Sequence, residues 1–264
     1  MPGTEDTSGS AAEGALSERP TVLVPIRVLA GETVPEGVPA MLAHAHVVLL
    51  GYHVIPEQTA PGQARMQFED EALDRLEDLE EGFEAAGATV EPRLVFTHEA
   101  QKTINRQIYE HGAIAVLVPD AVPAVERILV AVRGTVGADR LTRVVAGLFG
   151  PTDATITLLH VAAAEESDED ASTLLAGIAD RLAELGVDPD AVETRVERDV
   201  PALDAIVGES GAHDVVVMGE SDPTIATYFF GMPADQVGER FVGPVLVVQR
   251  ALPASSGEDG ASSD

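Results

Sequence analysis

The stretch that decides the fold is residues 212–219, which read AHDVVVMG. Its run of valines followed by methionine is short and apolar, which is typical of a strand buried in a parallel sheet. Residues 209–217, ESGAHDVVV, have a counterpart at residues 110–118, EHGAIAVLV. The second copy indicates that the chain contains an internal repeat.

Further matches stand in the same order in both halves, about 100 positions apart. Residues 22–27, VLVPIR, resemble residues 128–133, ILVAVR, and residues 47–54 resemble residues 155–161. An acidic amphipathic stretch follows in each half and predicts a helix that ends at a glycine, Gly87 or Gly186.

Strands that alternate with helices of this length predict an α/β fold of two tandem, doubly wound parallel-sheet domains. We place domain 1 at residues 20–122 and domain 2 at residues 123–250, with disordered tails at 1–19 and 251–264. Domain 1 runs almost directly into domain 2, so it is expected to lack the closing strand. Each half is therefore expected to form its own parallel sheet, and one sheet through both halves would contradict this.

Charge and composition exclude several classes of protein. The formal net charge is −29, and Lys102 is the only lysine among 16 basic residues. Such an excess of carboxylates favours a salty cytosol, as in a halophile, and the alternative is a merely acidic mesophilic protein. A polyanion is not expected to bind nucleic acid. The chain has no cysteine and no apolar run long enough to span a membrane, so we expect a cytoplasmic protein that is not membrane-inserted.

Domain 2 resembles the universal stress protein family along nearly its whole length. The resemblance rests on residues 127–132, 159–161, 212–219 and the closing stretch 243–248, GPVLVV. It implies a Rossmann-like domain of the adenine nucleotide alpha hydrolase type, and domain 1 is a degenerate copy.

The resemblance also implies a nucleotide site, because some members of the family bind ATP and others do not. Binding members use a glycine loop after the fourth strand, where backbone N–H groups approach the phosphates. Here the first glycine is present as Gly219, Asp222 replaces the second, and Gly231 falls one place early. Met232 follows where a hydroxyl is expected, and Arg133 replaces an adenine-contacting aspartate. The positions of this degenerate site are Arg133, Val161, Gly219, Gly231 and Met232.

Two other features leave alternatives open. Arg27 and Arg133, at the ends of equivalent strands, form either an anion site or strand-end charges satisfied by nearby carboxylates. The apolar residues 228–230 either dock a partner or fill the gap left by an absent nucleotide. His53 and His160 read as equivalent, satisfied histidines rather than metal ligands.

No catalytic set emerges, so we do not expect an enzyme. The chain is expected to be a regulatory, stress-response binding protein without family-type ATP binding and without a cofactor. It would act on a protein partner such as a transporter. The alternative is a sensor that binds ATP or AMP in domain 2. A homodimer through the closing strand of domain 2 is a further expectation.

Overall fold

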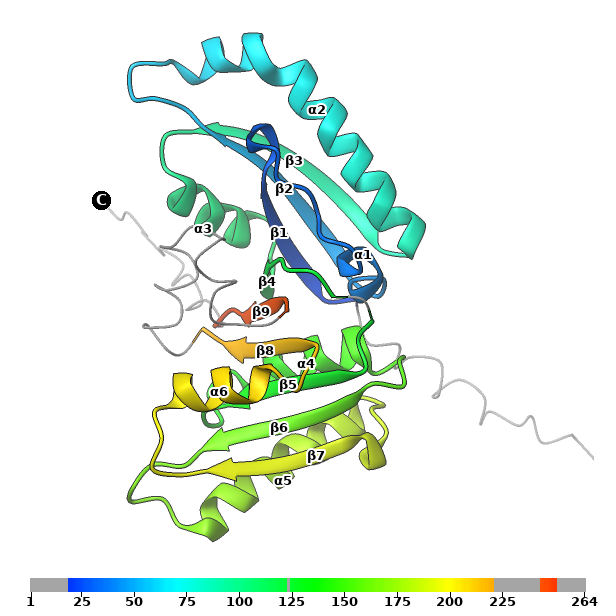
Figure 1. Ribbon diagram of the computed structural model, residues 1–264, viewed down its shortest axis with the longest axis vertical. Coiled ribbons are helices and arrows are strands. Elements are labelled where there is room, and N and C mark those ends of the chain that lie inside the picture. Colours follow the sequence, from blue (N-terminus) through cyan, green and yellow to red (C-terminus); the bar gives the residue numbers. More distant parts are fainter. Residues whose placement is uncertain (1–18, 123, 221–242, 251–264) are drawn as a thin grey trace, which may run out of the picture.

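The computed structural model describes residues 19–122, 124–220 and 243–250. Within these ranges, nine strands form a single sheet in the order β3-β2-β1-β4-β9-β8-β5-β6-β7 (Figure 1). The predicted tails lie outside the described residues, apart from Arg19, whose guanidinium donates to the carbonyl oxygen of Gly87 at 2.8 Å.

The first half contains four strands and the helices between them. They are β1 (Thr21–Arg27), η1 (Val28–Ala30), α1 (Val38–Met41), β2 (His46–Val54), α2 (Pro61–Ala86), β3 (Thr89–Thr97), α3 (Ala100–Glu110) and β4 (Ala115–Val118).

The described residues of the second half, 124–220 and 243–250, contain five strands. Its elements are β5 (Arg127–Val132), α4 (Ala138–Phe149), β6 (Thr155–Val161), α5 (Asp168–Glu184), η2 (Pro189–Ala191), β7 (Val192–Glu197), α6 (Ala202–Ser210), β8 (Val215–Gly219) and β9 (Val245–Val248).

Both halves have the strand order third, second, first, fourth, and all pairs within a half are parallel. The second half adds β9, which is parallel to β8. The α/β fold and the missing closing strand of the first half are therefore confirmed.

The expectation of a separate sheet in each half is wrong. β4 has β1 on one side only, and its other edge pairs antiparallel with β9, from Ala115 opposite Val248 to Val118 opposite Val245. The physical reason is the missing strand itself, because an apolar strand with an unpaired edge leaves backbone N–H and C=O groups without partners. The closing strand of the second half satisfies both halves at once.

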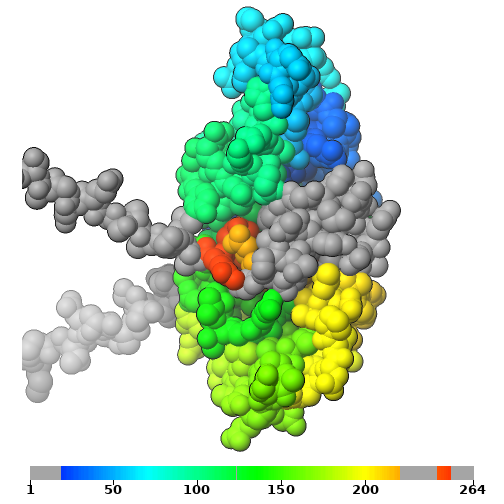
Figure 2. All heavy atoms as spheres, turned by 90° about the vertical axis from the view of Figure 1, so that its left-hand side faces the viewer, coloured from blue at the N-terminus to red at the C-terminus, as the bar shows by residue number. Residues whose placement is uncertain are grey.

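This pairing also contradicts the expected homodimer through the closing strand. β9 has β8 on one edge and β4 on the other, so neither edge is open to a second chain. Figure 2 shows the segment 243–250 at the surface between the two halves. The outer strands of the sheet are β3 and β7, which carry charged residues such as Arg93 and Arg195.

Helices cover both faces of the sheet, as the continuous apolar strands require. On one face α1, α2, α4 and α5 share one core that runs through both halves. On the other face α3 and α6 cover two separate clusters. The shared core contains side chains from each half that are fully buried, among them Leu49, Phe83, Leu158 and Leu246.

A close contact joins the halves on that shared face. Gly147 lies inside α4, and a Cβ built on it would meet Cδ of Pro20 at 2.7 Å. Pro20 is buried and directly precedes β1. Glycine at 147 therefore lets α4 of the second half approach the start of the first half.

Local signals in the sequence are also confirmed. α2 ends at Ala86, and Gly87 follows in the left-handed conformation at φ 108°. α5 ends two residues before Gly186, which also has positive φ. No helix of the described ranges is long and apolar enough to cross a membrane.

Candidate functional site

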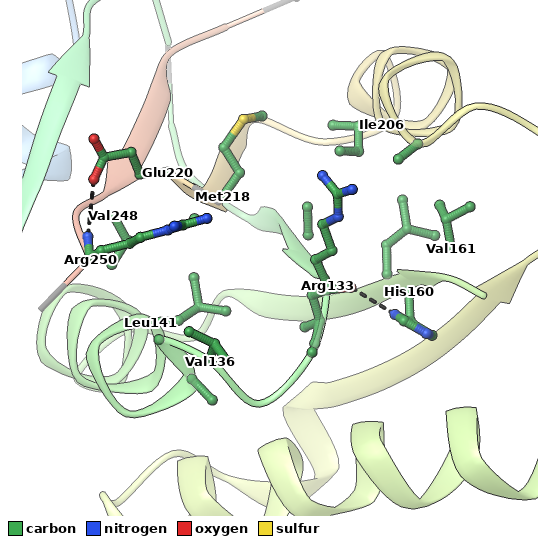
Figure 3. Close-up of a pocket in the computed structure, with 18 of the residues that line it drawn as sticks. Arg133, Val136, Leu141, His160, Val161, Ile206, Met218, Glu220, Val248 and Arg250 are labelled. Carbon is green, nitrogen blue, oxygen red and sulfur yellow. Dashed lines mark hydrogen bonds between the residues drawn. The ribbon is translucent and has the colours of Figure 1, made fainter. Parts of the chain in front are cut away.

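A cavity of about 370 Å³ lies in the second half, at the carboxyl ends of β5, β6 and β8 (Figure 3). Doubly wound sheets place ligands at this edge. The volume falls in the lower part of the ~300–1,000 Å³ range of ligand pockets. The β5–α4 loop, the start of α4, the end of β6, the start of α6 and the segment after β9 form its walls.

Three of the five residues proposed from the sequence lie together in this cavity. Arg133 follows β5, Val161 ends β6 and Gly219 ends β8, and all three line the cavity. Gly231 and Met232 lie outside the described residues, as do residues 228–230. A nucleotide-binding role for these positions stays a prediction.

His160 and Glu166 form one wall of the cavity and contact each other. The imidazole is 4% exposed, its Nδ1 lies 2.8 Å from the carbonyl oxygen of Val132, and its Nε2 lies 2.9 Å from Glu166 Oε1. The other oxygen of Glu166 accepts from the N–H of Ala163 at 3.1 Å. That N–H first, and His160 after it, lower the pKa of the Glu166 carboxyl. The histidine is thus satisfied by a carbonyl and a carboxylate, as the sequence indicated.

The opposite wall is formed where β8 and β9 end side by side. The N–H of Glu220 donates to the carbonyl oxygen of Val248 at 2.8 Å, and the Glu220 carboxylate accepts from the N–H of Arg250 at 3.1 Å. Arg140 of α4 donates to the carbonyl oxygen of Arg250 at 3.0 Å. In Figure 3 the side chain of Arg250 extends from the left toward the middle of the view, where the side chain of Arg133 lies.

The remaining surface of the cavity is apolar. The residues that provide it come from the β5–α4 loop, α4, the strands and α6, and they are Val136, Leu141, Leu159, Ile206, Met218 and Val248. The cavity therefore combines an apolar body with two arginines and two acids whose carboxylates already accept hydrogen bonds. This composition suits an amphipathic small molecule.

Sequence reasoning missed Arg250 and Glu166 as cavity residues, whereas Glu220 belongs to the loop in which the sequence placed the nucleotide site. Arg250 directly follows the closing stretch, and the ends of parallel strands meet at one edge, so this position carried a usable signal. Glu166 belongs to an acidic run that reads as a solvated surface. Among the described residues no group of three or more histidines, cysteines, aspartates or glutamates could hold a metal ion.

Comparison with protein families identifies the segment that contains this cavity. Residues 124–249 match the universal stress protein family. The matched range is slightly less than half of the chain and includes both walls of the cavity except Arg250. A comparison with curated proteins gives no match.

Solved structures of universal stress proteins resemble the chain. One from Archaeoglobus fulgidus DSM 4304 is 16% identical with a TM-score of 0.58, and the match covers 89% of this chain and 98% of that one. This likeness shows that the fold of both halves together occurs in that protein.

Two further structures match about half of the chain. A universal stress protein from Archaeoglobus fulgidus in complex with dAMP is 20% identical with a TM-score of 0.37, over 47% of this chain and 97% of that one. A universal stress protein family member from Arabidopsis thaliana with AMP bound is 20% identical with a TM-score of 0.37, over 49% and 97%.

Proposed function

We propose that the chain is a two-domain universal stress protein that acts by binding and not by catalysis. The observation that carries the proposal is the open cavity at the carboxyl ends of β5, β6 and β8, within the segment that matches the family. A small ligand held there would regulate the contact of the protein with a partner. The family resemblance suggests a membrane transporter as one example of such a partner.

The ligand is not Mg-ATP held in the manner of the family. The sequence of the loop after β8 has Asp222 and Met232 where a glycine and a hydroxyl are expected. A backbone can approach a phosphate closely where glycine leaves room, and an acidic side chain opposes the charge of a triphosphate. We also propose a salty cytosol as its setting, because the net charge of −29 is strongly repulsive without screening.

A nucleotide sensor is the second candidate function. The cavity lies where doubly wound sheets bind nucleotides, and its volume is large enough to favour a ligand over a structural void. In this candidate ATP or AMP would occupy the cavity of the second half.

Native mass spectrometry of the purified chain tests whether a small molecule is retained. The control is Val161→Tyr, which fills the cavity with a larger side chain from the end of β6. We expect a bound mass in the wild type that is absent from the variant. A ligand-binding function would be contradicted if the wild type and Val161→Tyr gave the same spectrum without a bound mass, and if no small molecule bound to the wild type on titration.

Calorimetric titration with Mg-ATP and with AMP at high salt separates the two candidates. We expect no Mg-ATP binding with a dissociation constant of about 10 μM or tighter, which corresponds to about −7 kcal/mol. Tighter binding that Val161→Tyr abolishes would replace the first candidate by the nucleotide sensor.

A further inference from the structure

The polar and charged side chains that line the cavity already have partners within the protein. They are Arg133, His160, Glu166, Glu220, Gln249 and Arg250. The imidazole of His160 lies 2.8 Å from the carbonyl oxygen of Val132 and 2.9 Å from the Glu166 carboxylate. The other oxygen of that carboxylate accepts from the N–H of Ala163 at 3.1 Å. Both groups of this wall are therefore engaged before any ligand arrives.

The other polar groups of the cavity are engaged as well. The Glu220 carboxylate accepts from the N–H of Arg250 at 3.1 Å, and the side-chain amide of Gln249 donates to the carbonyl oxygen of Val247 at 3.2 Å. Arg133 and Arg250 each have an interaction partner in the protein. A charged ligand would have to displace such a contact or remain unpaired. Both cost free energy, because a charge that leaves water needs partners.

The lining of the cavity also contains both signs of charge. Glu166 and Glu220 would oppose an anion, and the net charge of −29 adds to this effect. The guanidinium groups of Arg133 and Arg250 would oppose a cation. A ligand of either charge therefore meets like charge in the cavity, whereas an uncharged ligand does not.

Apolar side chains line the cavity from both faces of the sheet. Leu141 belongs to α4 and Ile206 to α6, and these helices cover opposite faces. In Figure 3 Ile206 and Met218 lie in the upper part of the view, and Leu141 and Val136 lie in the lower part. An apolar molecule in the cavity would contact side chains from both sides, which removes its surface and theirs from water.

Val136 is an apolar side chain of the lining that is open to solvent. It is 79% exposed and belongs to the loop between β5 and α4, where Gly134 and Gly137 on either side of it have positive φ. Met66 of α2 is exposed to a similar degree, 85%, and does not line the cavity. A ligand with an apolar surface would cover part of Val136, and this contact stabilises the bound state.

We propose that the cavity binds an uncharged ring compound of about two or three rings, whose polar groups are neutral ones such as a hydroxyl or a carbonyl. The size follows from the volume, because an apolar cavity of ~150 Å³ holds one benzene molecule, and this cavity measures about 370 Å³. The lack of charge follows from the engaged polar groups and the mixed signs of charge in the lining. This inference rests on the proposed ligand-binding function and names the chemical class of the ligand.

Displacement of a neutral fluorescent reporter, N-phenyl-1-naphthylamine, tests the proposal. The competitors share one naphthalene body and differ in charge near neutral pH, since 1-naphthol is neutral, 1-naphthoate is an anion and 1-naphthylmethylamine is a cation. The full chain is titrated in ~1 M potassium chloride, where the Debye length is about 3 Å, so the net charge of the chain is screened and the lining decides. We expect 1-naphthol to displace the reporter at a concentration at least tenfold lower than either charged competitor.

Variants of Val136 show whether the reporter binds in the cavity. Val136→Ser removes the exposed apolar group of the lining, and Val136→Ile keeps it. Met66→Ser is the matched control, because it removes a similarly exposed apolar group from α2 of the first half. Both side chains are exposed, so the fold should be kept, which circular dichroism checks. We expect Val136→Ser to weaken binding of the reporter at least threefold, and Val136→Ile and Met66→Ser to change it less than twofold.

The outcomes separate this inference from the proposed function. Equal displacement by 1-naphthol and by a charged competitor would overturn the uncharged ligand and leave a ligand-binding cavity, as would calorimetric binding of a charged competitor alone. Equal effects of Val136→Ser and Met66→Ser would also overturn the inference, because the reporter would then bind outside the cavity. If neither the reporter nor any competitor binds to the wild type in calorimetry, both the inference and the proposed function are wrong.

Discussion

Replacing one glycine by alanine tests how the two halves are joined. Gly147 lies inside α4, and a Cβ added there would meet the ring of Pro20 at 2.7 Å. Alanine is favoured over glycine inside a helix by about 1 kcal/mol. Against this gain stands the cost of forcing an extra carbon into a packed contact, which is about 1–3 kcal/mol. The two effects oppose each other, and the contact between the halves decides the sign.

Gly177 in α5 provides the matched control. It also lies inside a helix of the second half, but a Cβ built on it would meet no atom within 4 Å. Gly177→Ala should therefore stabilise the protein by about 0.5–1 kcal/mol. Gly147→Ala receives the same helical gain and bears the packing cost. It should be neutral or destabilising by up to ~2 kcal/mol, and less stable than the control by about 1–3 kcal/mol.

Urea unfolding measured by far-ultraviolet circular dichroism, at one fixed salt concentration, gives both free energies of unfolding. The slopes with urea should agree between variants, so that the midpoints report stability alone. If Gly147→Ala stabilises the protein as much as Gly177→Ala, then α4 does not pack against Pro20, and the arrangement of the halves is wrong.

Three further predictions concern salt, acid and cooperativity. The thermal midpoint should rise from low salt to ~2 M potassium chloride because the carboxylates are then screened, and a flat or falling midpoint would count against screening. The pKa of Glu166 is lowered, so its stabilisation is present above the ordinary value of 4.5 and is lost as the pH falls below it. Glu166→Gln should thus lower the thermal midpoint near neutral pH and have less effect at acid pH. A loss of thermal stability that is larger at acid pH than at neutral pH would contradict a lowered pKa of Glu166. Leu246→Ala should cost about 2–5 kcal/mol and loosen both halves together in hydrogen exchange, whereas unchanged protection of β1 would show that the halves unfold separately.

The sequence predicted the strands because each is a short apolar run, and the helix ends because Gly87 and Gly186 mark them. It could not predict the β4–β9 pair. Residues 115–118, AVLV, would suit a pair with any apolar strand, parallel or antiparallel. Which strand lies beside β4 depends on how the two halves pack, and the local sequence does not show this. The missing strand was visible in the sequence, whereas its replacement by a strand of the other half was not.

The candidate site was predicted in part. Arg133, Val161 and Gly219 follow from strand ends, which all lie at one edge of the sheet. The equivalence of His53 and His160 is wrong by two residues. Ile26 and Val132 are equivalent positions of the first strand in each half. The register sets Gly51 opposite Ile26 and His160 opposite Val132, so His160 is equivalent to Gly51 and not to His53. Two repeats of a chain align reliably by sequence within one strand. A loop of different length changes the spacing to the next strand, so residues of that strand are matched correctly only by the residue pairs of the sheet.

For Arg27 the structure decides between the two alternatives of the sequence, because the Glu32 carboxylate lies against it. The acid stands five residues along the chain, across a glycine, and the pattern alone does not show that the loop folds back.

β9 gives the first half a structural role at the cavity of the second half. One edge of β9 pairs with β4. Beyond the last pair of these strands, Ala115 and Val248, the N–H of Gln249 donates to the carbonyl oxygen of Ile114 at 2.8 Å. Val248 and Arg250, on either side of Gln249, line the cavity of the second half. Removing the first half would expose the edge of β9 and release the segment that forms one wall of the cavity. The first half thus contributes to the site by holding β9 in place.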